Sequence, residues 1–178
     1  MNVVNINIAD DAWNACSRFD EWQSLLLPLL DCTVGKLYEK YVPLDVNLLL
    51  TNSEDIRELN RKFRNVDAST NVLSFPQYEP DIVPDILQTD DKIATPPNKN
   101  VLALGDIAMA RGKIMEECGE YGLEFFDRCS HLFVHGVFHL LGLDHMNQED
   151  ECKMENLEIR VLGEFGIDNP YISKERSI

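Results

Sequence analysis

The chain has 178 residues, of which 44% are hydrophobic and 26% are charged. This length is typical of one domain, and the composition is that of a globular protein, which excludes a collagen, a coiled coil and wholesale disorder. Asp and Glu total 31 against 16 Lys and Arg, so the net charge is −15 and the surface as a whole repels nucleic acid. A function on nucleic acid therefore requires a local basic patch.

The N-terminus and the cysteines indicate a cytoplasmic protein. The opening residues, MNVVNINIADD, contain neither the basic region nor the apolar core of an export signal. No apolar run approaches the ~20 residues of a membrane span. The five cysteines are scattered and form no Cys-x-x-Cys pair, which fits neither a disulfide framework nor a zinc ribbon. We expect reduced cysteines, a cytoplasmic location and no membrane partner.

Hydrophobic periodicity predicts strands early in the chain and helices late, an arrangement typical of an α+β fold. Strands are predicted at residues 3–8, 44–50, 72–75 and 101–108. Helices are predicted at residues 20–40 with breaks at Pro28 and Gly35, from Ser53 as N-cap, and at 110–118, 123–141 and 148–162. We expect one domain over residues 1–178, with a small four-stranded mixed sheet flanked by helices. The proline-rich residues 77–100 are predicted to be a mobile surface excursion.

All four histidines lie within HLFVHGVFHLLGLDH, residues 131–145. His135 and His139 are four residues apart, so on a helix both side chains point to one side and can reach one metal ion. Gly142 can end that helix in a left-handed conformation and return the chain so that His145 reaches the same ion. Three neutral imidazoles are typical ligands of zinc. The spacing therefore predicts one Zn²⁺ on a helix that lines a cleft.

The two residues nearest this pattern have other predicted roles. His131 lies one turn before His135, and we expect it to pack beside the ligands rather than to bind the ion. Gly136 follows the first predicted ligand, where the metzincin proteases with the same histidine spacing carry a glutamate as general base. Glycine cannot accept a proton, so either the metal acts without that base or another residue supplies it. This argues against a peptidase.

Several separated motifs resemble one family. HGVFHLLGLDH resembles the H-G-x-x-H-L-x-G-x-D-H motif of the YbeY family of metal-dependent endoribonucleases. LNRKFRNVDASTNVLSFP at residues 59–76, LALGDIAMA and QEDECKMENLEIRVL resemble further blocks of that family in the same order. The resemblance covers most of residues 44–163. Asn65 and Ser69 depart from it, standing where Lys and Pro are usual.

The resemblance implies a zinc-dependent, single-strand-specific endoribonuclease that acts in rRNA processing, including maturation of the 16S rRNA 3′ end, and in ribosome quality control. Its partners would be single-stranded RNA or an rRNA precursor, and the ribosome or proteins of its small subunit. Arg64 is the family's functional arginine by the same resemblance, and we expect it and His135 to be catalytic. Arg64 ends the basic run 57–64, which carries a net charge of +3 and is the patch that RNA binding requires.

Two other functions are compatible with the sequence. The chain could be a ribosome-associated assembly protein in which zinc is structural. It could also be a metal-dependent hydrolase of another substrate class. Cleavage of single-stranded RNA that depends on the metal distinguishes the endoribonuclease from both. The sequence does not indicate an oligomeric state.

Overall fold

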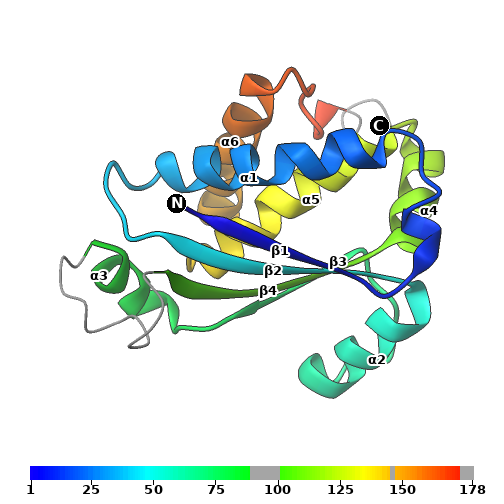
Figure 1. Ribbon diagram of the computed structural model, residues 1–178, viewed down its shortest axis with the longest axis horizontal. Helices are drawn as coiled ribbons and strands as arrows, with labels where there is room; N and C mark the ends of the chain where they lie inside the picture. The colour runs from blue at the N-terminus through cyan, green and yellow to red at the C-terminus, as the bar shows by residue number, and fades with distance from the viewer. Residues whose placement is uncertain (89–100, 145–146, 173–178) are drawn as a thin grey trace.

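The computed structural model describes residues 1–88, 101–144 and 147–172, and its elements have an α+β arrangement (Figure 1). The strands are β1 (Val3–Ile8), β2 (Leu44–Thr51), β3 (Val72–Pro76) and β4 (Leu102–Ala110). The α-helices are α1 (Phe19–Gly35), α2 (Ser53–Arg64), α3 (Val83–Gln88), α4 (Arg111–Tyr121), α5 (Phe125–Leu140) and α6 (Gln148–Glu164). Two short 3₁₀ helices are η1 (Asp11–Trp13) and η2 (Pro80–Ile82). The predicted fold class and all four strands are confirmed.

The sheet is mixed, with the strand order β1-β2-β4-β3. β1, β2 and β4 are parallel, and β3 is antiparallel to β4 at the edge. Helices α1, α5 and α6 lie over one face of the sheet, and α2 lies on the other (Figure 1). α5 packs against both β3 and β4. The fold therefore places the histidine helix directly beside an edge strand.

Two apolar clusters hold these layers together. The larger one lies between the sheet and α1, α5 and α6, and Trp22, Leu48 and Phe133 are fully buried within it. The smaller one fixes α2 to the opposite face through Ile56 and Leu73. Burying one such side chain contributes about 1.5–3 kcal/mol. These clusters set the positions of α2 and α5, which carry the predicted site residues.

Two of the predicted helix signals are wrong in detail. Helix α1 continues through Pro28, because Pro28 is on the exposed side while Trp22, Leu26 and their neighbours are buried. That burial outweighs the roughly 3 kcal/mol that a proline costs inside a helix. The N-cap of α2 is Asn52 and not Ser53, since the Asn52 side chain accepts hydrogen bonds at 2.9 Å from the N–H groups of the second and third helical residues.

The excursion predicted at residues 77–100 is partly described. Its first part contains η2 and α3, whose residues Val83 and Leu87 are buried against the larger core. Residues 89–100 lie outside the described residues. Among the described helices, none is both long and apolar enough to span a membrane.

Candidate active site

Helix α5 presents two histidines to a cleft. Its N-terminus is capped by Glu124, whose carboxylate accepts hydrogen bonds at 2.8 and 3.3 Å from the N–H groups of the second and third helical residues. Helices α1 and α6 and strands β3 and β4 cover most of α5. Between residues 129 and 140 only His135 and His139 are not buried. Because the rest of this part of α5 is buried, the two histidines, four residues apart, lie together on its accessible side.

Gly136 lies where α5 comes close to the sheet. A Cβ atom added there would lie 3.0 Å from Ile107 Cδ1 and 3.1 Å from Ser74 Oγ, which is tighter than ordinary contact. A glutamate at this position would be pressed into the sheet rather than directed into the cleft. The absence of the metzincin general base therefore has a packing cause in this fold.

The C-terminus of α5 has the turn that the sequence predicts. Gly142 has a φ of +88°. Its N–H donates to the carbonyl oxygen of His139 at 3.0 Å, and the N–H of Leu143 donates to the carbonyl oxygen of Phe138 at 3.0 Å. These two bonds define a Schellman motif, which reverses the chain after the helix. His145, the third predicted ligand, lies outside the described residues. Among the residues that are described, no three His, Cys, Asp or Glu side chains are arranged to hold one metal ion.

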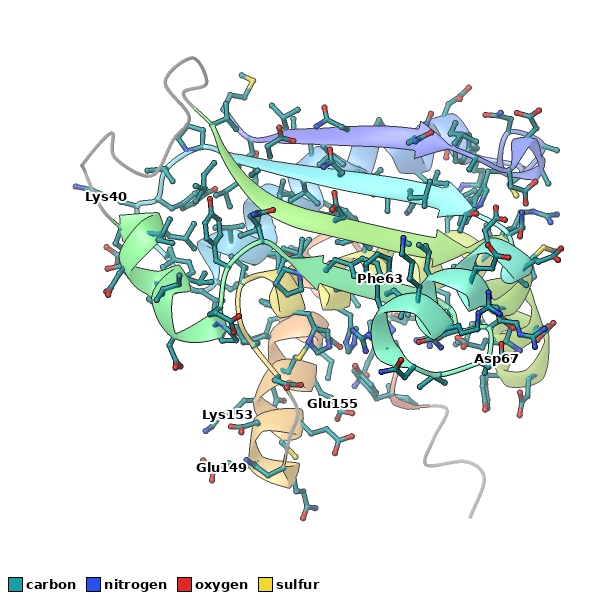
Figure 2. All side chains as sticks on the ribbon, turned by 90° about the horizontal axis from the view of Figure 1, so that it is seen from below. Lys40, Phe63, Asp67, Glu149, Lys153 and Glu155 are labelled. Carbon is teal, nitrogen blue, oxygen red and sulfur yellow. The ribbon has the colours of Figure 1, made fainter. Side chains whose placement is uncertain are left out.

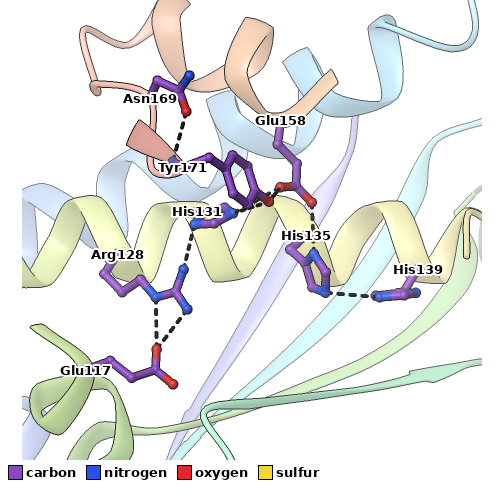
Figure 3. Close-up of polar contacts among 8 residues, drawn as sticks. All are labelled: Glu117, Arg128, His131, His135, His139, Glu158, Asn169 and Tyr171. Atoms are coloured by element: carbon purple, nitrogen blue, oxygen red, sulfur yellow. Dashed lines mark hydrogen bonds and ion pairs between the residues drawn. The ribbon is translucent and has the colours of Figure 1, made fainter. Parts of the chain in front are cut away.

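The two described histidines are arranged as a pair of metal ligands would be. Nε2 of His135 and Nε2 of His139 are 3.0 Å apart, and the two rings are nearly perpendicular at 80° (Figure 3). Two ligand atoms at the zinc–nitrogen distance from one tetrahedral ion lie roughly 3.3 Å apart. The donor atoms of His135 and His139 therefore fit a shared zinc ion, and His145 stays the predicted third ligand.

Glu158 on α6 orients His135. Its Oε1 lies 2.8 Å from Nδ1 of His135, and its Oε2 lies 3.0 Å from Nε2 of His131 (Figure 3). Burial raises the pKa of Glu158, but hydrogen bonds from His131 and His135 outweigh this effect and lower that pKa to about 2. An ionised carboxylate only accepts hydrogen bonds, so Nδ1 of His135 carries the proton. Such carboxylate–histidine pairs are typical supports of metal ligands.

His131 is buried and is directed to Glu158 rather than to His139. Its side chain is 5% exposed, and Nδ1 lies 2.8 Å from Nη1 of Arg128. Burial lowers the pKa of His131, against the opposing effect of Glu158, so the ring is neutral. This geometry agrees with the expectation that His131 packs beside the predicted ligands.

Arg64 reaches the same cleft from the end of α2. Asn65 follows it with a φ of 57° and ends that helix. The guanidinium Nη2 of Arg64 donates to the carbonyl of Ser74 on β3 at 3.4 Å. The cleft has a volume of about 370 Å³. The residues that line it include Arg64, Asn71, Ser74, His135, His139 and Asp144.

The remaining basic residues of α2 do not share this position. Arg57 forms a two-point ion pair with Asp67, with contacts of 2.8 and 3.0 Å, so its charge is neutralised away from the cleft. Phe63 is 56% exposed and packs edge-on against Phe75 on the opposite side of the sheet from α5 (Figure 2). Of the four basic residues in the run, Arg57, Arg61, Lys62 and Arg64, only Arg64 lines the cleft.

Comparison with known proteins assigns the chain to a family. A protein-family model described as Endoribonuclease YbeY matches residues 7–166. The chain belongs to the YbeY family. Among its relatives, an Endoribonuclease YbeY from Francisella tularensis subsp. novicida is 35% identical over 175 residues, which cover 98% of this chain and 97% of that protein. One from Francisella tularensis subsp. tularensis is also 35% identical, covering 98% of this chain and 94% of the relative.

A solved structure has the same fold as this YbeY-family chain. It is the solution structure of a Thermotoga maritima protein, which is 21% identical and superposes with a TM-score of 0.54. The match covers 97% of this chain and 95% of that protein. At this identity the likeness concerns the fold alone, and it agrees with the α+β sheet described above.

The sequence did not identify several residues that meet at this site. Arg128 bonds Glu117 of the preceding helix, and Tyr171 bonds Glu158 from the segment after α6, so both contacts depend on how separate elements pack together. The available signal was weak: Glu158 is an acid within the apolar stripe of α6, at a position that packing buries. A buried acid requires donors, but a single sequence does not say which residues provide them.

Proposed function

We propose that this chain is a zinc-dependent endoribonuclease that cleaves single-stranded RNA. The observation that carries the proposal is the pair of Nε2 atoms of His135 and His139, 3.0 Å apart, in a cleft that also holds Arg64. Membership of a family whose model and relatives are named Endoribonuclease YbeY supports RNA as the substrate. We further propose that the RNA is an rRNA precursor, with the 16S 3′ end as a target and ribosome quality control as the context.

The proposed ligands of one zinc ion are His135, His139 and His145. When bound, zinc supplies Lewis acidity, which polarises a phosphoryl oxygen and makes water more acidic at neutral pH. Glu158 holds the His135 ring so that Nε2 is directed into the cleft. We propose that Arg64, which lines the cleft, binds the scissile phosphate and stabilises the negative charge that develops on it. A local cation in this cleft offsets the repulsion expected from a net charge of −15.

The acidic surface restricts how RNA approaches. Helix α6 projects beyond the sheet with Glu149 and Glu155 at its N-terminal half (Figure 2). Glu149 pairs with Lys153 at 2.8 Å, but residues 148–156 as a whole carry a net charge of −3 and repel a phosphate backbone, whereas Arg64 in the cleft attracts it. We propose that the strand approaches from the side of α2 and β3. The proposed ribosomal partners follow from the family resemblance, and the proposed cytoplasmic location follows from the scattered cysteines, which fit no disulfide framework.

Cleavage of an end-labelled single-stranded RNA tests the proposal. Zinc-loaded protein is expected to cut the RNA, whereas chelated protein and the His139→Ala variant are expected to be inactive. Arg64→Ala is expected to retain zinc and lose cleavage by at least about 100-fold, as loss of one charge-stabilising donor usually does. Arg160→Ala on α6 removes the same charge outside the cleft and serves as its matched control.

The result that overturns the proposal is a zinc-loaded protein that binds RNA and does not cut it. Ribosome binding that survives His139→Ala would then favour the assembly protein with a structural zinc. Cleavage of casein in place of RNA would favour a hydrolase of another class. The ends of the RNA products also show whether water or a 2′-hydroxyl attacks, because only the second route leaves a cyclic phosphate.

A further inference from the structure

A cluster of polar side chains lies behind His135, on the side away from His139 (Figure 3). We name it the polar cluster, and it consists of two buried residues, His131 and Glu158, and three half-buried ones, Glu117, Arg128 and Tyr171. These residues come from α4, α5, α6 and the segment after α6. Burying His131 and Glu158 is costly unless each of their hydrogen bonds is made, and the polar cluster supplies donors and acceptors for both side chains.

The hydrogen bonds of Arg128 orient the polar cluster. Its Nε and Nη2 donate to Oε2 of Glu117 at 3.0 and 2.8 Å, and Asn71 donates to the other oxygen of Glu117 at 2.8 Å. This pairing directs Nη1 of Arg128 to Nδ1 of His131 at 2.8 Å. A guanidinium can only donate, so Nδ1 of His131 must accept and its proton must sit on Nε2.

The proton on His131 then determines how Glu158 is used. Nε2 of His131 donates to Oε2 of Glu158 at 3.0 Å, and the hydroxyl of Tyr171 donates to the same oxygen. Two donors therefore hold Oε2. The other oxygen, Oε1, accepts from Nδ1 of His135 at 2.8 Å. With its proton on Nδ1, a neutral His135 presents an unprotonated Nε2 to the cleft.

We propose that His131 and Tyr171 are positioning residues for His135, which act through Glu158 to select its tautomer and aim its Nε2. The inference rests on the proposed function, because His135 can bind a metal ion through Nε2 only when that nitrogen is unprotonated. Neither residue lines the cleft that His135 shares with Arg64 and His139. Partners of this kind typically change metal affinity about 10–100-fold when they are removed.

Tyr171 brings a segment from beyond α6 into the site. Its backbone N–H donates to the side chain of Asn169 at 2.9 Å, which holds the segment in a turn. Its ring packs edge-on against His131, with the ring centres 5.1 Å apart. Tyr171 also lines a second pocket, of about 270 Å³. His135 lines both this pocket and the cleft. The family match ends at residue 166, so this contribution comes from outside the matched region.

The test compares three variants of the full chain. Tyr171→Phe removes one donor to Glu158 and keeps the ring. Glu158→Gln replaces one acceptor oxygen by an NH₂ group, which must face the N–H of either His131 or His135. Tyr121→Phe is the matched control, because Tyr121 is 52% exposed and lies outside the polar cluster. Circular dichroism checks that each variant is folded.

Two readouts are measured without RNA. Imidazole nitrogen–proton NMR spectra of the zinc-free protein report which ring nitrogen is protonated. The wild type is expected to carry the proton on Nδ1 of His135 and on Nε2 of His131. Glu158→Gln is expected to change the tautomer of one of these two rings. Competition with a coloured chelator measures zinc affinity, and we expect at least about tenfold weaker binding in both Tyr171→Phe and Glu158→Gln.

The inference is overturned if the wild-type His135 carries its proton on Nε2, or if Tyr171→Phe binds zinc within twofold of Tyr121→Phe. Its failure is distinguishable from failure of the proposed function. Weaker zinc binding in the variants together with a wild type that cuts no RNA would overturn the endoribonuclease alone. A wild type that binds no zinc would overturn the metal centre, and the tautomer change in Glu158→Gln would then decide the inference.

Discussion

Replacing Gly142 with Ala tests how strongly the turn after α5 supports the site. Gly142 has a φ of +88°, and an added Cβ atom would lie 3.0 Å from Cα and 3.2 Å from the carbonyl oxygen of Pro80. The left-handed conformation costs an L-residue about 1–2 kcal/mol. Crowding against backbone atoms, which shift less easily than a side chain, adds about 1 kcal/mol. We expect Gly142→Ala to lower the free energy of unfolding by about 2–3 kcal/mol.

Urea unfolding of the zinc-free protein measures this change, with Gly119→Ala as the control. Gly119 is in α4 and an added Cβ would meet no atom within 4 Å, so Ala there is expected to raise the free energy of unfolding by up to about 1 kcal/mol. If the turn opens locally instead, the same free energy appears as weaker zinc binding, with a tenfold loss of affinity for each roughly 1.4 kcal/mol. Equal stability of the two variants, with unchanged zinc affinity, would refute this reasoning.

Four further predictions follow from individual contacts. Asn52→Ala should lower the free energy of unfolding by about 1 kcal/mol, because two N–H groups of α2 lose their acceptor; in urea unfolding, a loss as large in Ser53→Ala would contradict this. Zinc should dissociate as the pH falls below about 6, because ligand histidines must be neutral, and zinc retained at pH 5 would disprove it. The free energy of unfolding of the zinc-free protein should also decrease as the pH falls below about 6.5 and further below about 4.5. Burial lowers the pKa of His131 in the folded protein, and the hydrogen bonds to Glu158 lower the pKa of that carboxyl despite its burial. The unfolded chain therefore binds more protons than the folded one, which gives the sign. Urea titrations in a pH series measure the free energy of unfolding, and a profile that is flat with pH would count against the prediction. RNA affinity should weaken steeply with salt, and Arg64→Ala should reduce the slope of log affinity against log salt by about 1. Binding isotherms at several salt concentrations measure this slope. An identical slope in Arg64→Ala and wild type would exclude the phosphate contact.

Local patterns predicted the parts of the fold that depend on neighbouring residues. The alternation in Val3–Ile8 specifies a strand, and the apolar spacing of residues 123–141 specifies a helix, because each pattern matches the repeat of its own element. Gly142 was predicted to end α5, since glycine adopts the left-handed conformation at little cost. The spacing of His135 and His139 likewise placed both rings on one side of the helix.

Where signals in the sequence competed, tertiary contacts decided the outcome. Pro28 alone predicts a break, but the apolar residues around it are buried and α1 continues. Asn52 and Ser53 are both good caps by type, and only the backbone path of β2 into α2 makes Asn52 the acceptor. The basic run 57–64 is one pattern in sequence, yet Arg57 pairs with Asp67 while Arg64 enters the cleft.

The sequence by itself therefore determined the elements, the family and the histidine pair, because these depend on residue types at short spacing. Only the tertiary structure brought Glu158 to His135 across 23 positions of chain and Tyr171 to His131 across 40. Such contacts depend on how α5, α6 and the segment after it pack together. Burial makes each contact matter, since a carboxylate removed from water must be held by donors, and one of the donors to Glu158 is the ring of His135, which lines the cleft.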